Sequence, residues 1–327
     1  MPVKILYVSD RQDGGILQHV RCLRECLPPE VESYEIGRGG DEEFAGRNGH
    51  DFREWIQIRR VIRTFKPDIV HFHIPTLMMI LYARFFSRVR LVRSWHISTL
   101  GSEGLKDRII RWLLGSRCYY LPVSFSVWKG LQRWVPHIRG EVFFNPLRLG
   151  GHPTPAFLAG WKGLKPTVGM VGRDAEVKDW PSFHAVERVV KEHMPEVDFV
   201  NGGEKMMCNG REVIAGLDLF MMTSKNEALP TTMLECFLLG TPICGFLPEG
   251  GAGDVLAFST GPVRDAFMVE RDCGKLAKLV ECLLEDVDRR RRMVEDGWQI
   301  LTQHFAAEKL VKGELMDVYR RVLQRGW

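Results

Sequence analysis

Short apolar runs alternate with amphipathic helical patterns along nearly the whole chain, and this alternation limits the fold more than any other feature. Short apolar runs bounded by turn residues are typical of buried strands, and strands that alternate with helices form parallel sheets. We therefore expect an α/β fold. The expected strands are 4–9, 68–73, 89–96, 119–124 and 141–145, then 166–172, 197–203, 217–223 and 241–246. The expected helices lie near 17–27, 52–65, 76–87, 104–115, 180–193, 231–239, 273–303 and 305–325.

The chain has 327 residues, which is about right for two domains. Asn145-Pro146 and the following stretch LGGHPTPA resemble a linker, because Gly and Pro interrupt regular structure there. We expect two Rossmann-like, doubly wound domains that face a central cleft. The predicted domains are residues 1–148, with the C-terminal helix 305–327 packed back on them, and residues 149–304.

Composition favours a soluble globular protein, with 45% hydrophobic and 26% charged residues. Neither an apolar run of transmembrane length nor a signal-peptide layout at the N-terminus is present in the sequence, so we expect a cytoplasmic protein. Its eight cysteines are scattered without paired CxxC spacing, which favours reduced core thiols over a structural zinc site.

Charge is distributed unevenly along the chain. Residues 1–150 hold 23 Lys and Arg against 15 Asp and Glu, whereas the remainder holds 22 against 26. A basic first half can bind an anionic partner or can be an ordinary solvated face. The segments 84–93 and 106–117 combine basic and aromatic residues, which is compatible with an anionic membrane surface or with strand and helix flanks.

The segment TSKNEALPTTMLECFLLGTPICG carries Glu227 and Glu235, which are eight residues apart. It predicts a buried strand, a polar loop with Glu227, and a helix with Glu235. α/β proteins bind ligands at the carboxyl ends of parallel strands, where a helix N-terminus also offers free N–H groups. Two carboxylates placed there suit the hydroxyls of a ribose or a hexose. Taken alone, the two glutamates could equally be solvated surface residues.

Two further turns resemble phosphate-binding features. Gly14-Gly15 lies between the first strand and its helix, where glycine lets a ligand approach the backbone. Arg173 and Lys178 follow the strand 166–172, and two cations there can neutralise a diphosphate. A plain tight turn and a solvated loop remain the alternatives.

Histidines end two of the expected strands. His96 follows the strand 89–96, where it can hydrogen-bond a bound sugar or can be a satisfied structural histidine. His71 and His73 are two residues apart and therefore share a strand face. The sequence shows no third ligand at metal spacing, so no metal site is expected.

Together these motifs resemble the retaining glycosyltransferases of family 4, which have the GT-B architecture and an E-x7-E motif. The resemblance covers most of the chain. It rests on Gly14-Gly15, on DIVHFH and SWHIS, on FFNP, on VGRDAEVKDW, and most specifically on SKNEALPTTMLECFLLGTPICG. The chain departs from the family between residues 203 and 217, where a further βα unit is usual and the base pocket is therefore abbreviated. Ala228 also replaces a glycine.

The resemblance implies a role for each matching residue. Arg173, Lys178, Gly14 and Gly15 would hold the donor diphosphate, and Glu235 would bind the ribose. Glu227 and His96 would contact the transferred sugar, and the loop Ala228, Leu229, Pro230 and Thr231 would line the sugar and phosphate. No cofactor and no metal is expected, because the donor is a nucleotide-diphosphate sugar used as a co-substrate.

The resemblance implies a nucleotide-sugar-dependent, retaining hexosyltransferase that builds cell-surface polysaccharide or glycolipid. Its partners would be the nucleotide sugar, a glycan or lipid-linked acceptor and an anionic membrane surface, which would place it on the inner membrane face. A donor-binding pseudo-enzyme or scaffold subunit and a GT-B sugar-nucleotide epimerase remain alternatives. A nucleic-acid partner is not expected, because no recognisable RNA- or DNA-binding module is present.

Overall fold

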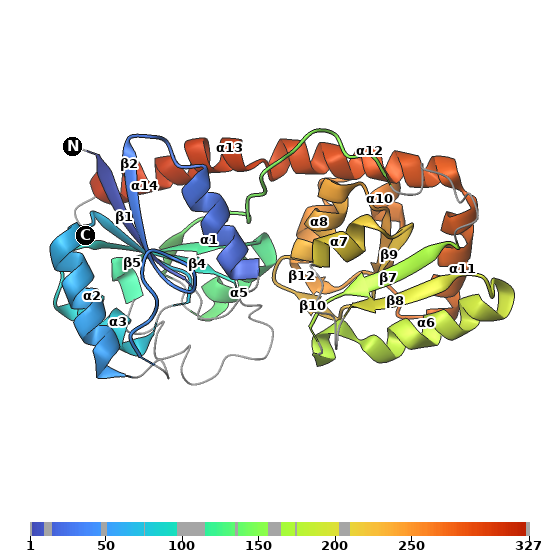
Figure 1. Ribbon diagram of the computed structural model, residues 1–327, viewed down its shortest axis with the longest axis horizontal. Helices are drawn as coiled ribbons and strands as arrows, with labels where there is room; N and C mark the ends of the chain where they lie inside the picture. Colours follow the sequence, from blue (N-terminus) through green and yellow to red (C-terminus); the bar gives the residue numbers. More distant parts are fainter. Residues whose placement is uncertain are drawn as a thin grey trace. The chain divides into compact units, whose positions relative to one another are not determined.

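The computed structural model describes residues 2–9, 15–46, 51–74, 76–96, 115–134, 137–155, 165–173, 175–202 and 210–324. Contacts within the chain divide it into two compact units: Met1–Arg148 together with Phe305–Trp327, and Leu149–His304. Each unit contains its own parallel sheet with helices packed on it (Figure 1). The predicted fold class, α/β with two Rossmann-like sheets, is confirmed.

The first unit is built on a six-stranded parallel sheet in the order β2-β1-β3-β4-β5-β6. β1 and β3 pair so that Tyr7 lies beside His71. Side chains alternate across a strand, so Tyr7 and His71 point to the same face of this sheet. The strands are β1 Val3–Val8, β2 Val31–Ile36, β3 Ile69–Phe72, β4 Arg90–Trp95, β5 Cys118–Pro122 and β6 Arg139–Gly140.

Four helices connect these strands among the residues that the structure describes in this unit. They are α1 Gly15–Glu25, α2 Phe52–Phe65, α3 Leu77–Phe85 and α5 Phe125–Trp134, and a short 3-10 turn spans Gly115–Arg117. α1 buries Leu17, Val20 and Leu23, whose spacing of three places them on one helix face. α2 begins where the Asp51 side chain accepts from the Arg53 N–H. Local sequence therefore determines both the face and the start of these helices.

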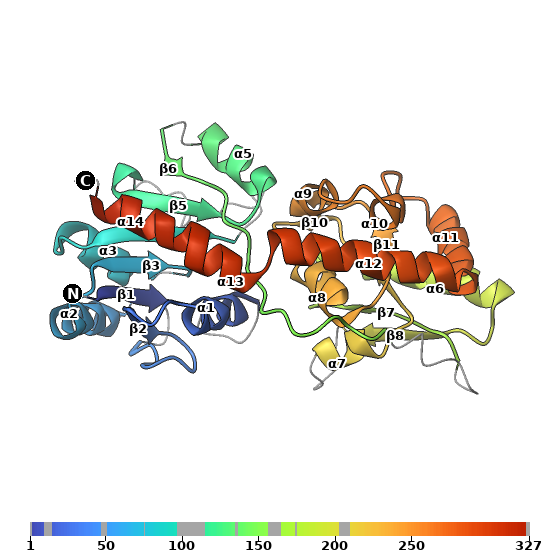
Figure 2. The same cartoon turned by 90° about the horizontal axis from the view of Figure 1, so that it is seen from above.

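The C-terminal segment completes the core of the first unit. It consists of α13 Ala307–Lys309, the π-helical turn η4 Leu310–Leu315 and α14 Met316–Gln324, which lies along the strands in Figure 2. Val311, Leu315 and Tyr319 belong to one buried cluster with residues of β1, β3 and β4. The Tyr319 hydroxyl lies 3.1 Å from the Tyr7 hydroxyl and 2.7 Å from Nδ1 of His71. This segment is therefore joined to the sheet by both apolar packing and buried hydrogen bonds.

The second unit contains a five-stranded sheet in the order β13-β11-β9-β7-β8. Its described strand pairs are parallel. A separate parallel pair, β10 and β12, contains Glu227 as the last residue of β10. The strands are β7 Thr167–Val171, β8 Asp198–Gly202, β9 Leu219–Met222, β10 Asn226–Glu227, β11 Ile243–Phe246, β12 Glu249–Gly250 and β13 Phe267–Met268.

In the second unit, α6 and α8 have the bounds that the sequence pattern predicts, whereas α7, α9 and α10 were not expected. α8 ends at Gly240, which has a φ of 73° that favours glycine. The helices are the 3-10 turn η3 Glu176–Lys178, α6 Trp180–His193, α7 Gly210–Ala215, α8 Thr231–Leu239, α9 Gly251–Leu256, α10 Pro262–Asp265, α11 Cys273–Glu285 and α12 Val287–His304.

Three expectations about these elements need correction. A strand was expected over 141–145, but the observed strand, β6, ends before it at Gly140. The N–H groups of Glu141 and Phe143 still donate to the carbonyls of Tyr120 and Pro122 in β5. The helix expected over 273–303 is two helices, because the backbone of Asp286 leaves the helical region. β2 and α5 were not expected at all. The helix expected at 104–115 falls almost entirely outside the described residues.

Candidate active site

Lys178 follows the carboxyl end of β7 and crosses the backbone at Gly172. A Cβ added at Gly172 would lie 2.9 Å from Cε of Lys178, so the absence of a side chain lets the lysine stem pass. Arg173 is the next residue, and its guanidinium is exposed, while its carbonyl accepts from the indole N–H of Trp180. The two cations expected to hold a diphosphate therefore leave the same strand end.

Lys178 and Glu227 form an ion pair across 49 residues of sequence. Nζ of Lys178 lies 2.7 Å from Oε1 of Glu227, and each side chain is 15% exposed. Glu227 is held in β10, which pairs with β12 so that Glu227 lies beside Gly250. A largely desolvated cation and carboxylate thus lie side by side at the ends of two neighbouring strands, where a ligand can contact both.

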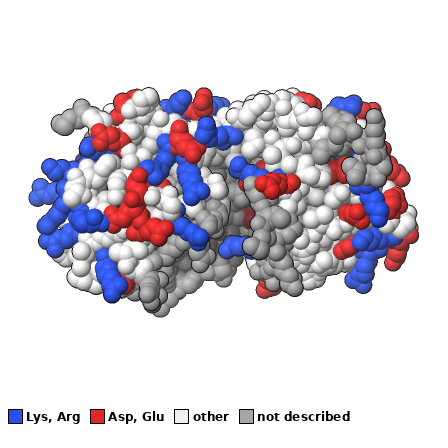
Figure 3. All heavy atoms as spheres, in the orientation of Figure 1, with Lys and Arg blue, Asp and Glu red and all other residues white. Residues whose placement is uncertain are grey.

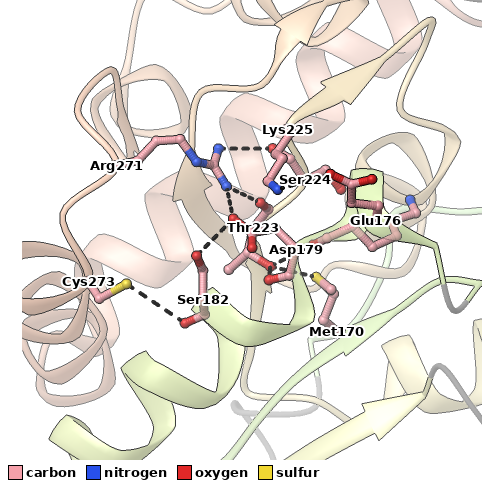
Figure 4. A network of polar contacts seen from close by, with 10 residues as sticks. Met170, Glu176, Asp179, Ser182, Thr223, Ser224, Lys225, Arg271 and Cys273 are labelled. Carbon is pink, nitrogen blue, oxygen red and sulfur yellow. Dashed lines mark hydrogen bonds and ion pairs between the residues drawn. The ribbon is translucent and has the colours of Figure 1, made fainter. Parts of the chain in front are cut away.

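A polar network fixes the backbone next to the Lys178–Glu227 pair (Figure 4). Arg271 donates to the carboxylate of Asp179 at 2.6 Å and to the carbonyls of Thr223 and Ser224. The Thr223 hydroxyl lies 2.9 Å from the carbonyl of Lys178. Burial opposes the ionised form of Asp179, but the Ser182 hydroxyl and Arg271 outweigh it and lower the pKa of Asp179. The ends of β7 and β9 are therefore tied together immediately behind Lys178.

Glycines bring the next segment against the loop that follows Glu227. A Cβ at Gly250 would lie 2.3 Å from the carbonyl oxygen of Glu227, and a Cβ at Gly251 would lie 2.0 Å from that of Ala228. Gly250 also has a φ of 95°. Only glycine permits an approach this close, so these two residues determine the path of the loop. In that loop Leu229 and Pro230 are buried, while Ala228 and Thr231 are partly exposed.

Glu235 projects from α8 and is paired with a cation from α7. Its Oε1 lies 2.9 Å from Nε of Arg211, and its side chain is 22% exposed. The N-cap of α8 is Pro230, and no side chain of the described residues caps its first turn. Backbone N–H groups at that turn remain available to an anion. The segment expected to be abbreviated, 203–217, contains α7 and contributes Arg211; residues 203–209 lie outside the described ones.

In the first unit, His96 belongs to a cluster of three histidines, with the buried His73 and His19. His73 and His96 follow the ends of β3 and β4. Nε2 of His96 lies 3.1 Å from Nδ1 of His73, and the ring of His19 from α1 lies 5.0 Å from the ring of His96. Burial, reinforced by the charge of Arg93, lowers the pKa of His96 to about 3. Burial and the neighbouring histidines also lower the pKa values of His19 and His73.

This cluster corrects the expectation that no third nitrogen ligand is available. The ligand atoms of His19, His73 and His96 all lie within 4.8 Å of one another. The sequence pattern concealed this because His19 lies on a helix and joins the other two only when α1 packs on the sheet. Gly15 begins α1 and is exposed, whereas Gly14 lies outside the described residues.

Several residues of the site were not singled out from the sequence. Arg211 and Arg271 contact motif residues that are 24 to 92 residues away in sequence, and no local pattern indicates such contacts. Asp179 lies next to Lys178 in the motif, but its ion pair with Arg271 has no local signal. The glycine turn at Gly250-Gly251 was visible in the sequence, but its contact with the Glu227 loop was not.

Among the described residues, no helix is both long and apolar enough to span a membrane.

Comparison with known proteins finds similarity to glycosyltransferases. Residues 16–138 match the family model Glycosyltransferase Family 4. The chain is 26% identical over 189 residues to 2-deoxystreptamine N-acetyl-D-glucosaminyltransferase of Streptomyces fradiae, a match that covers 49% of this chain and 43% of that protein. It is 27% identical over 113 residues to a lipopolysaccharide core biosynthesis glycosyltransferase of Rhizobium meliloti (strain 1021), covering 35% and 31%. The matches thus span less than half the length of these relatives.

Solved structures show the same fold over the whole chain. The Anabaena protein Alr3699/HepE, crystallised with UDP and glucose, superposes with a TM-score of 0.71 at 14% identity, covering 97% of this chain and 100% of that one. At this identity the likeness establishes the fold alone. The chain therefore has the GT-B fold, and its residues 16–138 are similar to glycosyltransferase family 4.

Proposed function

We propose that this protein is a retaining hexosyltransferase that uses a nucleotide-diphosphate sugar as donor. The observation that supports this most directly is the Lys178–Glu227 pair, because one partner suits a phosphate and the other suits a sugar hydroxyl. The uncapped first turn of α8 lies at the end of the same loop and offers N–H groups to an anion. A donor diphosphate and its sugar fit this combination of charge and hydrogen-bond donors.

In this proposal, each side chain of the second unit acts on one part of the donor. Arg173 and Lys178 bind the diphosphate, Arg with a bidentate fork and Lys as a point charge. Glu227 accepts a hydrogen bond from the transferred sugar, and Glu235 accepts from the ribose. For Glu235 to do so, its carboxylate has to accept hydrogen bonds from both Arg211 and the ribose hydroxyls.

The chemical step follows from this placement of charge. The bond between the anomeric carbon and the diphosphate oxygen breaks, and negative charge grows on the leaving diphosphate. Arg173, Lys178 and the N–H groups of α8 stabilise that charge. The acceptor oxygen attacks from the same face, and its proton passes to the departing phosphate, so configuration is retained without a carboxylate nucleophile. No metal is needed at the diphosphate in this scheme, since these cations supply the positive charge.

We propose that residues of the first unit also bind the donor. His96 contacts the transferred sugar, and Gly14 and Gly15 approach the phosphates.

The nature of the relatives supports the choice of substrates. One matched relative is an N-acetyl-D-glucosaminyltransferase, another acts in lipopolysaccharide core biosynthesis, and a structural neighbour was crystallised with UDP and glucose. We therefore propose a nucleotide-diphosphate hexose as donor and a glycan or lipid-linked acceptor, in the synthesis of a cell-surface polysaccharide or glycolipid.

An anionic membrane surface is proposed as the place where such an acceptor is met. Lys and Arg side chains gather over the edge of the first unit where α2 lies (Figure 3). Phe52, Phe85 and Phe86 are between 56% and 64% exposed beside them. Of the segments predicted for this role, 84–93 is described, whereas 106–117 falls mostly outside the described residues. Aromatic and basic side chains side by side are typical of proteins that bind the membrane interface.

The test compares Glu227→Gln with Glu249→Gln, an exposed glutamate on the strand paired with β10. Loss of a charge-assisted hydrogen bond costs about 1.5 to 3 kcal/mol, which corresponds to a loss of about 10- to 100-fold in rate. We expect Glu227→Gln to lose transfer by this factor while its fold, followed by circular dichroism, stays intact, and Glu249→Gln to transfer normally. Equal transfer by the two variants would refute the assignment of Glu227.

Other readings make different predictions for the same assay. A pseudo-enzyme or scaffold is favoured by one observation, namely that Arg211 already pairs with the carboxylate assigned to the ribose. It predicts that no nucleotide sugar is consumed by the wild-type protein, even when one binds and raises the unfolding temperature. An epimerase would convert the donor when no acceptor is present, so product analysis without acceptor separates it from a transferase.

A further inference from the structure

Two buried histidines of the first unit leave ring nitrogens without hydrogen-bond partners among the described residues. His19 is 4% exposed, and both of its ring nitrogens are unpartnered there; His73 is also 4% exposed, and its Nε2 is unpartnered. A buried polar group without a partner costs about 1 to 3 kcal/mol. Such groups call for an explanation, which is often an ordered water or an ion.

The neighbouring histidine of the same sheet face behaves differently. His71 is fully buried, but its Nδ1 contacts the Tyr319 hydroxyl and its Nε2 contacts the Ser94 hydroxyl at 2.9 Å. Both of its nitrogens are therefore engaged in the fold. Burial alone therefore does not explain the unpartnered nitrogens of His19 and His73, which lie beside His96.

The three rings are spaced as they would be around a single metal ion. Ring centroids of His19, His73 and His96 are 5.1, 5.0 and 5.4 Å apart, and Nδ1 of His73 lies 3.1 Å from Nε2 of His96. Imidazole nitrogens about 2.05 Å from a tetrahedral zinc ion lie about 3.3 Å apart, which places the ring centroids about 5.2 Å apart. The cluster therefore has room for one ion among the nitrogens.

We propose that His19, His73 and His96 form a binding site for one divalent transition-metal ion of the zinc class. Each histidine supplies one nitrogen, and one coordination position stays open to water or another oxygen ligand. Imidazole ligands favour zinc, copper or nickel over magnesium and calcium, which prefer oxygen. The ligands are held by α1 and by the ends of β3 and β4, so the packed core of the first unit fixes their positions.

The proposal makes no use of the transfer reaction. An ion on Nε2 of His96 leaves Nδ1 of that ring for another contact, so the same residue can serve both the ion and the sugar of the proposed function. Because the experiments below measure metal binding, their failure leaves the proposed transfer untouched, and failure of transfer leaves the metal site untouched.

The first experiment uses tag-free full-length protein that has been stripped with a chelator and then titrated with Zn²⁺ by calorimetry. The critical variant is His19→Leu, and the control is His184→Asn, an exposed histidine on α6 of the other unit. We expect wild type and His184→Asn to bind one equivalent. His19→Leu should bind at least about tenfold more weakly, since even supporting residues of a metal site cost 10- to 100-fold when lost.

Leucine at position 19 also keeps the variant informative. It replaces a buried unpartnered imidazole by an apolar side chain, so the metal-free variant should unfold at the same temperature as the wild type or higher. Zn²⁺ should raise the unfolding temperature of the wild type but not of His19→Leu. Absence of stoichiometric binding to the wild type, or binding to His19→Leu as tight as to the wild type, would overturn the proposal.

A second measurement needs no variant at all. Zinc-edge X-ray absorption on the loaded wild-type protein should show nitrogen ligands at about 2.0 to 2.1 Å with the multiple-scattering pattern of imidazole. A first shell with sulfur would assign the ion to the cysteines instead and overturn the proposal. Bound Co²⁺ should likewise give the visible absorption of a tetrahedral site without thiolate charge transfer.

Discussion

Substitution of Gly251 by alanine tests whether the glycine turn positions the loop that follows Glu227. The added Cβ would lie 2.0 Å from the carbonyl oxygen of Ala228 and 2.8 Å from its carbonyl carbon. An ordinary C···O contact needs about 3.3 Å, so one of the two segments has to move by more than about 1 Å. Gly251 does not have a positive φ, so the expected effect is steric and involves no backbone strain at that residue.

The displacement should be visible in both stability and activity. Overpacking of this kind costs about 1 to 3 kcal/mol of unfolding free energy. A shift of 1 Å in a substrate-positioning loop costs about 100-fold in rate. Both are measurable, the first by calorimetry of the second unit, and the second by kcat/KM for transfer from the nucleotide sugar that most raises the unfolding temperature in a thermal-shift screen.

Gly253→Ala is the matched control, because it lies two residues further on in the same helix, α9. A Cβ there would meet nothing within 4 Å. Alanine should therefore be tolerated and should add up to about 1 kcal/mol of helix stability. If Gly251→Ala and Gly253→Ala had the same stability and the same kcat/KM, the inference that close backbone approach positions this loop would be refuted.

Three further predictions concern other parts of the molecule. Tyr319→Phe should destabilise the first unit by about 2 to 5 kcal/mol, because it leaves the Tyr7 hydroxyl and Nδ1 of His71 buried and unpartnered. The control, Tyr7→Phe, should cost about 1 kcal/mol of unfolding free energy. Equal losses for the two variants in denaturant unfolding would contradict this prediction. The pKa of Asp179 is lowered in the fold, so its stabilisation is complete above the unfolded value of about 3.9 and is lost as pH falls through the folded value. Calorimetry between pH 5 and 2 should therefore show a smaller pH dependence for Asp179→Asn than for wild type, and identical slopes would count against it. Transfer should proceed at the same rate with and without added Mg²⁺, and Lys178→Met should raise the donor KM; strict Mg²⁺ dependence would refute the assignment of the diphosphate charge to protein cations.

The sequence alone was enough to predict the two-sheet α/β fold and most of its elements. Helices α2, α6 and α8 begin and end where the pattern placed them, because their apolar spacing and their flanking Asp, Gly and Pro residues act locally. The predictions that were wrong involve weak local signals. β2 (VESYEI) alternates polar and apolar residues only loosely, and the break at Asp286 interrupts an otherwise continuous helical pattern.

The candidate site divides in the same way. The sequence was enough to select four site residues: Glu227, Glu235, Arg173 and Lys178. A strand end followed by a polar loop can be recognised from the local sequence, and parallel strands bring their carboxyl ends to one edge of the sheet. Which of these groups touch was decided by the tertiary structure, which pairs Lys178 with Glu227 and Glu235 with Arg211.

The histidine cluster and the Arg271 network depend even more on tertiary packing. His19 reaches His73 and His96 only because the apolar face of α1 packs on the sheet, and Arg271 reaches Asp179 across 92 residues. Contacts of this kind depend on how helices dock on sheets, and that docking is set by the whole core. The sequence by itself therefore determined the elements and the chemistry at their ends, and only the folded structure decided which of those groups meet.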